Sequence, residues 1–282
     1  MPSIAESLEK VESVLAESGV AEPRREAMSL LTLATKKGKT FLYAHPEHIL
    51  TTEEVTILSD FLERRANREP LQYISGVQEF FGLEFEVTPD VLIPRPETEM
   101  VVERAIEILR ASGGGLVCDI GTGSGCIAIS ILFELPDVRA VGLDISLDAL
   151  TVAARNAEKH GIGERLHLRE SDLFSALTDE KFDLIVSNPP YVPQRDVAGL
   201  QAEVRDFEPR SALTDNSDGL SIIRRIVNES PRFLAADGHL VMEIGFDQSD
   251  KVGALFDPAL WFGPKFFPDF QGIPRLVSAQ LI

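Results

Sequence analysis

The sequence predicts an α/β protein in which a small N-terminal helical domain precedes a mostly parallel sheet. From residue 116 onward, strand-like and helix-like segments alternate, the pattern of a parallel sheet with helices on both faces. Before that point, from Ser3 to about Arg68, apolar residues recur at helical spacing. A glycine-rich turn follows the first predicted strand of the sheet, which is where such folds bind nucleotides.

Residues 1–75 are expected to form a compact helical bundle. Ile4, Leu8, Val11 and Leu15 are spaced to cover one face of a helix, and prolines and glycines divide the stretch into helix-sized segments. Its basic clusters, such as the arginines between residues 64 and 68, are interpreted as solvated helix ends.

Residues 76–96 predict a β-hairpin and linker between this bundle and the large domain, which spans residues 97–282. Phe81, Leu83, Phe85 and Val87 alternate with glycine or glutamate, which is the period of a strand. The prolines of V-L-I-P-R-P-E-T-E then keep the chain extended until a helix begins near Glu97.

The alternating pattern of the large domain divides into six strand regions and three main helices. The predicted strands are Leu116–Ile120, Arg139–Asp144, Arg165–Arg169, Phe182–Ser187, His239–Ile244 and a final pair within Trp261–Ile282; the helices are residues 126–135, 147–160 and 219–235.

The net charge of −18 is concentrated in the larger part of the chain. Residues 1–75 hold 9 basic and 12 acidic side chains, whereas residues 76–282 hold 18 and 33. A field of that sign repels phosphate backbones, so a basic protein is a better candidate partner than nucleic acid. A role of this acidity in solubility alone is an equally simple interpretation.

Several classes of protein are disfavoured by composition. No apolar run has the ~20 residues of a membrane span, and the N-terminus lacks a secretory pattern, so a cytoplasmic protein without membrane contact is expected. Cys118 and Cys126 form no CxxC pair, and His45 and His48 have no third ligand nearby, so no metal is expected. A monomer is expected, because no long exposed apolar stripe is apparent.

The segment D-I-G-T-G-S-G indicates a nucleotide-type ligand. Gly121, Gly123 and Gly125, with Thr122 and Ser124 between them, permit a tight turn that exposes bare backbone at the carboxyl edge of the sheet. The spacing is GxGxG, whereas a dinucleotide site has GxGxxG, which argues against a pyrophosphate on the following helix.

Three side chains at successive strand ends extend this site. Asp144 ends the second strand, where a carboxylate can accept hydrogen bonds from both hydroxyls of a ribose. Asp172 follows the third strand and could accept the exocyclic amine of an adenine, with Leu173 covering the ring. The alternative for Asp144 alone is a helix cap near Ser146. Together the residues predict a pocket for adenosine attached to something short.

The fourth strand ends in S-N-P-P-Y at the same edge. Pro189 and Pro190 fix the backbone and donate no hydrogen bonds, so carbonyl oxygens and the side-chain oxygen of Asn188 can converge on one NH2 group, with Tyr191 as an apolar wall. Taken alone, the motif would serve equally well as a rigid turn.

The lone pair of an amide or aromatic NH2 group is delocalised, so its nitrogen is a poor nucleophile. Two fixed acceptors would favour a pyramidal nitrogen whose lone pair is exposed. If the cofactor is S-adenosylmethionine, its sulfonium methyl is already activated, and the protein mainly has to align nitrogen, carbon and sulfur.

At this point the sequence resembles the HemK-type methyltransferases that modify a glutamine of peptide chain release factors. The resemblance covers roughly residues 70–276 in ordered spacing. The motifs that carry it are L-Q-Y-I-S-G, E-F-F-G-L-E-F, L-I-P-R-P-E-T-E, D-I-G-T-G-S-G, S-N-P-P-Y, F-E-P-R-S-A-L, D-G-L, E-I-G-F-D-Q and D-F-Q-G-I-P-R.

The resemblance implies a class I, Rossmann-like methyltransferase domain with a seven-stranded sheet at residues 97–282, and a release-factor-docking domain at residues 1–75. It implies that S-adenosylmethionine binds at Gly121–Gly125, Asp144, the position of Leu173 and close to Asn188. Residues 188–191 would hold the glutamine of a Gly-Gly-Gln motif, with Asn188, Pro189 and Tyr191 in catalytic roles. The position of Leu173 is aromatic in some relatives, so apolar contact replaces stacking here.

Three alternatives remain at this stage. A methyltransferase acting on the NH2 groups of DNA or RNA bases would use the same motif, but the acidic charge and lack of a basic stripe oppose it. A regulatory module binding a nicotinamide cofactor through Gly121–Gly125 and Asp144 would leave residues 188–191 without a role. An inactive family member is the third.

Overall fold

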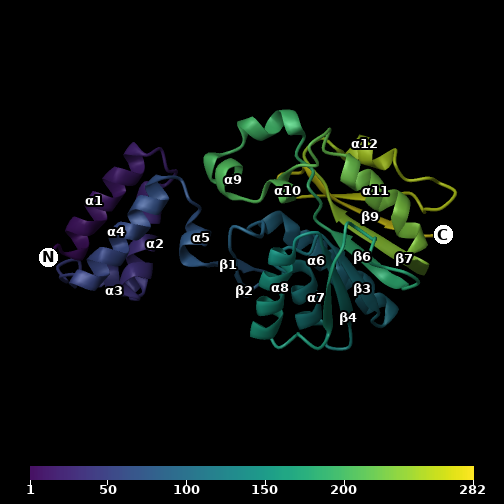
Figure 1. Cartoon of the computed structure of the whole chain (residues 1–282), viewed down its shortest axis with the longest axis horizontal. Helices are drawn as coiled ribbons and strands as arrows, with labels where there is room; N and C mark the ends of the chain where they lie inside the picture. Colours follow the sequence, from purple (N-terminus) through teal and green to yellow (C-terminus); the bar gives the residue numbers. More distant parts are fainter. The chain divides into compact units, whose positions relative to one another are not determined.

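The computed structural model describes every residue, Met1–Ile282, and the chain divides into two compact units (Figure 1). The helical unit comprises Met1–Gly76 together with Gln201–Phe207, and the sheet unit comprises Val77–Leu200 and Glu208–Ile282. The segment Gln201–Phe207, which sequence analysis placed within the large domain, therefore clusters with the helical unit.

The helical unit is a bundle whose helices begin at identifiable caps. Ser3 and Thr51 each accept a hydrogen bond from the backbone of a glutamate three residues later, and that glutamate's side chain accepts one from the cap backbone in return. Its helices are α1 (Ile4–Glu17), α2 (Pro23–Thr35), α3 (Lys39–Ala44), α4 (Thr52–Ala66), α5 (Leu71–Ser75) and α9 (Ala202–Phe207). Its core contains Ile4, Leu15, Leu30, Leu31 and Leu42, each almost completely buried.

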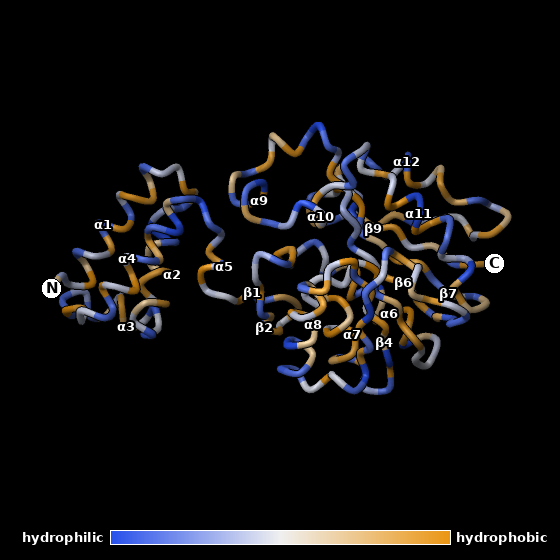
Figure 2. The backbone as a smooth tube through the Cα atoms, viewed as in Figure 1, coloured by the Kyte–Doolittle hydropathy of each residue, from blue (hydrophilic) through white to orange (hydrophobic).

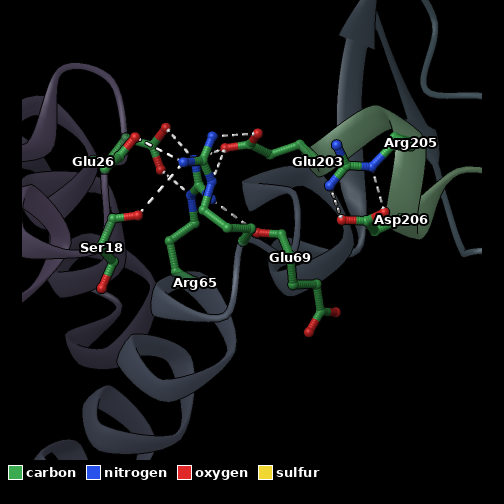
Figure 3. Close-up of polar contacts among 9 residues, drawn as sticks. Ser18, Glu26, Arg65, Glu69, Glu203, Arg205 and Asp206 are labelled. Atoms are coloured by element: carbon green, nitrogen blue, oxygen red, sulfur yellow. Dashed lines mark hydrogen bonds and ion pairs between the residues drawn. The ribbon is translucent and has the colours of Figure 1, made fainter. Parts of the chain in front are cut away.

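A cluster of charged side chains holds α9 within this unit. Figure 3 shows Arg65 of α4 between Glu26 of α2 and Glu203 of α9. Arg65 is only 3% exposed, and its Nη2 lies 3.0 Å from Glu203 Oε1; Arg68 Nη2 lies 2.6 Å from Glu203 Oε2. The expectation of a solvated helix end is therefore wrong for Arg65, because helical periodicity does not reveal acidic partners that are distant in sequence.

These contacts change the ionisation of Glu203. Partial burial opposes its negative charge, but hydrogen bonds from Arg68 and Arg65 outweigh that effect and lower the pKa of Glu203 to about 2. The carboxylate is therefore charged at neutral pH and pairs with both arginines.

The sheet unit contains a seven-stranded sheet in the order β5-β4-β3-β6-β7-β9-β8, and the predicted fold is confirmed. Its strands are β3 (Leu116–Ile120), β4 (Arg139–Asp144), β5 (Leu166–Glu170), β6 (Phe182–Ser187), β7 (Leu234–Glu243), β8 (Lys265–Pro268) and β9 (Pro274–Gln280). The first five strands in this order, β5-β4-β3-β6-β7, pair in parallel, whereas β9 is antiparallel to both β7 and β8.

The predicted hairpin precedes this sheet as β1 (Val77–Phe80) and β2 (Leu83–Glu86). Phe81 and Gly82 form its turn with φ of +51° and +71°, so Phe81 does not continue the alternating strand. The 3₁₀ turn η1 (Pro96–Thr98) and helix α6 (Glu99–Ser112) follow, close to the predicted helix start.

Helices cover both faces of the large sheet, because adjacent residues of each central strand point into different hydrophobic clusters. Val117 of β3 packs in the cluster of α6, α7 (Cys126–Glu134) and α8 (Leu147–Lys159), while Cys118 packs in that of α11 (Ser221–Glu229). Helix α7 is apolar along almost all its length, as expected for a helix buried on several sides (Figure 2).

The connections that follow β6 and α11 are short helical turns rather than long helices. Helix α11 ends earlier than predicted, because Pro231 lacks an amide hydrogen and the chain continues as a 3₁₀ turn. These remaining elements are η2 (Gln194–Gly199), α10 (Arg210–Leu213), η3 (Ser230–Arg232) and α12 (Ser249–Gly253). No helix in the chain is both long and apolar enough to cross a membrane.

Candidate active site

A cavity of about 350 Å³ opens where the strand order reverses, between β3 and β6. The carboxyl ends of these strands are adjacent, with Ile120 paired to Ser187, and Ser187 Oγ donates to the carbonyl of Ile120 at 2.8 Å. Ligands of open α/β sheets bind at this reversal point, because the two loops leave the sheet in opposite directions there.

The loop Gly121–Gly125 contributes bare backbone to the cavity. Gly121 and Gly123 have φ of +70° and +55°, and a Cβ on Gly121 would meet nothing within 4 Å. Gly125 does not line the cavity; its φ of +81° strains any residue with a Cβ, and a Cβ there would also lie 2.8 Å from Ile129 Cδ1. Residues 121–124 therefore face the ligand space, and the conformation of Gly125 sets the start of α7, whose first residues Cys126 and Ile127 also line the cavity.

Buried hydrogen bonds hold the rest of this loop. Thr122 Oγ1 donates to Asp119 Oδ2 at 2.8 Å, and Asn156 Nδ2 donates to the carbonyl of Ser124 at 2.9 Å. Burial raises the pKa of Asp119 to about 7, against the hydrogen bonds from Thr122 and the backbone of Ala128. The other oxygen of Asp119, Oδ1, is buried without a hydrogen-bond partner.

Asp144 lies beside the loop at the end of β4 and lines the same cavity. Its Oδ2 accepts from the Gly123 amide and its Oδ1 from the Ser146 amide, each at 2.9 Å. Ser146, not Asp144, caps α8, because the Ser146 hydroxyl accepts from the Ala149 amide. Burial raises the pKa of Asp144 despite both amides, and each oxygen retains a lone pair for a ligand hydroxyl.

Asp172 and Leu173 reach the cavity from the end of β5. Leu173 has φ of +50°, an uncommon conformation for this residue type, and packs against the hydrophobic cluster of α11. Asp172 Oδ1 forms an ion pair with Arg225 of α11 at 2.9 Å, a contact that sequence analysis did not anticipate. Its second oxygen remains for a ligand amine.

The S-N-P-P-Y segment brings an amide to the same cavity. Asn188 and Pro190 line it, whereas Pro189 and Tyr191 do not. Asn188 Nδ2 donates to Thr98 Oγ1 at 3.0 Å. Because the amide nitrogen is directed at Thr98, the oxygen on the other side of the amide group is available to a ligand.

A buried carboxylate lies behind this segment. Glu243, at the end of β7, is 2% exposed; its Oε2 accepts from Thr98 Oγ1 at 2.6 Å and its Oε1 from the Tyr191 hydroxyl at 2.9 Å. Burial raises the pKa of Glu243, while these two hydrogen bonds favour the charged form. Burial, and then the charge of Glu243, raise the pKa of Tyr191, so the phenol stays protonated.

The backbone of the segment is fixed by Gln248, whose Nε2 donates to the carbonyls of Tyr191 at 3.0 Å and Gly219 at 3.2 Å. Gly219 has φ of +78°, and a Cβ there would lie 2.3 Å from the Tyr191 carbonyl oxygen. The D-G-L and E-I-G-F-D-Q segments therefore support S-N-P-P-Y, and none of their residues lines the cavity.

A second pair of segments meets through Arg95 and Glu208, whose Nη2 and Oε1 lie 2.5 Å apart. Burial raises the pKa of Glu208, against the attraction of Arg95. This contact joins L-I-P-R-P-E-T-E to F-E-P-R-S-A-L, and residues of both segments line the cavity.

Sequence analysis missed the first part of this second wall, although it quoted the segment L-I-P-R-P-E-T-E. Spacing along the chain gave no indication that this segment and F-E-P-R-S-A-L face one cavity. The lining residues not predicted include Asp90, Leu92, Pro94 and Thr98. The others belong to the loop Pro193–Asn216, whose length and charge predict that it helps close over a substrate; they are Pro209, Ser211, Thr214, Asp215 and Asn216.

The charge of the lining discriminates between ligands. Asp90, Asp144, Asp172 and Asp215 line the cavity, and no lysine, arginine or histidine does. A cavity of this charge suits a cationic ligand such as a sulfonium and opposes the pyrophosphate of a nicotinamide dinucleotide. No group of three or more metal-ligating side chains is arranged to hold a metal ion.

Comparison with known sequences places both units in described families. Residues 6–76 match the PrmC N-terminal domain, and residues 102–204 match the methyltransferase small domain. The release factor glutamine methyltransferase of Geobacter sulfurreducens is 44% identical over 99% of this chain and 97% of its own length. That of Nitratidesulfovibrio vulgaris is 40% identical over 93% and 89%, respectively.

Solved structures agree with the fold of the sheet unit. A methyltransferase from Pyrococcus furiosus superimposes with a TM-score of 0.55 at 17% identity, over 78% of this chain and 98% of that one. The hMettl16 catalytic domain in complex with an RNA hairpin gives 0.57 at 17% identity, over 78% and 81%. At these identities the likeness concerns the fold alone.

Proposed function

This chain belongs to the family of release factor glutamine methyltransferases, and we propose that it transfers a methyl group from S-adenosylmethionine to the side-chain amide nitrogen of the glutamine in the Gly-Gly-Gln motif of peptide chain release factors. The observation that carries the proposal is that the Gly121–Gly123 backbone, Asp144 and Asn188 line one cavity. A cofactor and an amide can therefore meet within it.

The cofactor half of the cavity has the groups that an adenosyl sulfonium requires. Gly121 and Gly123 leave room for it beside the backbone, and Asp144 offers lone pairs to the ribose hydroxyls. Asp172 accepts the adenine amine, and Leu173 covers the ring. The four lining aspartates favour the positive sulfur, which supplies an already activated methyl group.

The substrate half holds the glutamine amide through acceptors only. Asn188 Oδ1 accepts one of its N–H groups, and we assign the other to the carbonyl of Pro189, the residue between the two that line the cavity; Pro190 limits how the amide can turn. Both hydrogens are then directed away from the cofactor, so the nitrogen lone pair is directed toward the methyl group. The nitrogen–carbon bond forms as the sulfur–carbon bond breaks, and the surplus proton on nitrogen leaves to solvent.

A single glutamine within a folded protein must be selected by contacts outside this cavity. We assign that role to residues 1–75, the N-terminal part of the helical unit, as the docking domain for the release factor. Release factors act on ribosomes, so this substrate also implies a cytoplasmic reaction.

The test is a methyl-transfer assay with labelled S-adenosylmethionine and an unmodified release factor, beside a copy whose motif glutamine is replaced by alanine. We expect label on the intact factor only, and a roughly 100-fold lower kcat for Asn188→Ala with little change in cofactor affinity. Asn228→Ala, at an exposed position of α11, is the matched control and should leave the rate unchanged.

Two outcomes would contradict this function. Label on the alanine copy would mean that another residue is the target. Label on nucleic acid offered in parallel, with none on the factor, would favour a base methyltransferase that uses the same cavity.

A further inference from the structure

Thr98 and Glu243 form a hydrogen-bonded chain that ends on the Asn188 amide. Glu243 Oε2 accepts from Thr98 Oγ1 at 2.6 Å, and Thr98 Oγ1 accepts from Asn188 Nδ2 at 3.0 Å. Thr98 and Glu243 are both 2% exposed, so little water reaches the hydrogen bond between them. The three residues come from η1, the end of β6 and the end of β7.

The chain has a direction that follows from the inventory of donors. The hydrogen bonds from Thr98 and Tyr191 favour the ionised form of Glu243 against the effect of burial. An ionised carboxylate only accepts, so in that form the single hydroxyl hydrogen of Thr98 is committed to Glu243. The oxygen of Thr98 then has only lone pairs left, and it can receive a donor but not offer one. Of the two polar groups of the Asn188 amide, only the NH2 group can donate a hydrogen bond to that oxygen.

Reversing the Asn188 amide would break this chain. Its oxygen would then face the lone pairs of Thr98, or Thr98 would turn its hydrogen away and leave a buried oxygen of Glu243 without a partner. Glu243 also accepts from the Tyr191 hydroxyl at 2.9 Å, so the same carboxylate fixes both ends of the N-P-P-Y segment.

We propose that Thr98 and Glu243 are positioning residues that orient the Asn188 amide so that it presents its oxygen, rather than its NH2 group, to the substrate. This inference rests on the proposed function, in which Asn188 accepts from an amide. Thr98 lines the cavity beside Asn188 but acts through it, and Glu243 acts through Thr98 and Tyr191. Neither prolines nor the strand end can set which way an asparagine amide faces.

The decisive variant is Thr98→Val, which keeps the shape of the side chain and removes its hydroxyl. We expect kcat for the release factor to fall about 10- to 100-fold, with the KM for the factor and the affinity for S-adenosylmethionine within about twofold of wild type. Thr98→Ser restores the hydroxyl and should recover most of kcat. Thr151→Val, which removes an exposed hydroxyl bonded to its own helix, is the matched control.

A second measurement reads the orientation without catalysis. In asparagine-labelled protein, assigned by loss of the signal in Asn188→Ala, the Asn188 side-chain amide protons should exchange slowly with water in wild type and Thr98→Ser. They should exchange faster in Thr98→Val. Glu243→Gln should shift the same signals, because an amide in place of the carboxylate no longer forces Thr98 to donate.

The two proposals fail separately. A wild-type protein that leaves the release factor unlabelled, but shows slow Asn188 protons that depend on Thr98, would overturn the proposed function and retain the positioning role. Unchanged kcat together with unchanged Asn188 proton exchange in Thr98→Val would overturn the positioning role.

Discussion

Asn156 connects the β-hairpin to the glycine loop, and replacing it with alanine should destabilise the sheet unit. The side chain is completely buried in α8. Its Oδ1 accepts from the Glu86 amide at 2.7 Å, and its Nδ2 donates to the carbonyls of Glu86 at 3.0 Å and Ser124 at 2.9 Å. Asn156→Ala removes all three hydrogen bonds at once.

The loss of stability in Asn156→Ala depends on the backbone groups that are left without a partner. A hydrogen bond contributes ~1 kcal/mol net, and a buried group left without a partner costs ~1–3 kcal/mol. For three bonds with partly hydrated partners, we expect the free energy of unfolding to fall by about 3–5 kcal/mol. Affinity for S-adenosylmethionine should fall as well, because Ser124 belongs to the loop that lines the cavity.

The assay is urea unfolding followed by fluorescence of Trp261, the single tryptophan, which is buried in the sheet unit. The matched control is Arg155→Ala, because Arg155 is the adjacent residue and also contacts Glu86. That ion pair is exposed, with side chains 45% and 38% accessible, so its loss should cost less than ~1 kcal/mol. Equal effects of the two variants would refute the reasoning.

Two further predictions concern charged groups. The pKa of Asp119 is raised from 3.8 to about 7, so the folded protein holds a proton that the unfolded chain releases, and stability should fall as pH rises between these values. Asp119→Asn should flatten that dependence in urea titrations from pH 4.5 to 8; an unchanged slope would exclude Asp119 as its source. The pKa of Glu203 is lowered to about 2. Its contribution to the free energy of unfolding is therefore present above the ordinary pKa of 4.5 and is lost as pH falls toward 2. At pH 7, Glu203→Gln should speed amide exchange of residues 201–207, whereas Asp206→Asn, which breaks an exposed pair with Arg205, should not (Figure 3); equal exchange in both variants would count against the role of Glu203.

The fold of the sheet unit could be predicted from sequence because its signals are local. A strand such as Phe182–Ser187 is a continuous apolar run, and the end of each strand is marked by a polar or glycine-rich turn. In a parallel sheet those ends share one edge, so Gly121, Asp144 and Asn188 could be grouped from the sequence alone. The structure places all three on one cavity.

The polar contacts that hold the residues at this sheet edge in place could not be predicted, because they join segments that are distant in sequence. Thr98 and Glu243 lie 145 residues apart, and neither residue type at its position indicates the other. The same applies to Arg95 and Glu208, 113 residues apart. Periodicity identifies which residues are buried, but it does not identify which buried polar groups pair.

The attachment of Gln201–Phe207 to the helical unit also depends on contacts between segments that are distant in sequence. The chain leaves the sheet unit after Leu200 and returns at Glu208, and the residues that come next, from Pro209 to Asn216, include much of one cavity wall. Arg65 is buried with a positive charge, which is stable only while Glu26 and Glu203 remain beside it. Unfolding the helical unit must therefore either expose that charge together with Glu203 or leave it unpaired. Glu203, which holds α9 within the helical unit, is only five residues from Glu208, whose pair with Arg95 joins the two segments of the wall, so two ion pairs between distant segments fix the two ends of this short stretch.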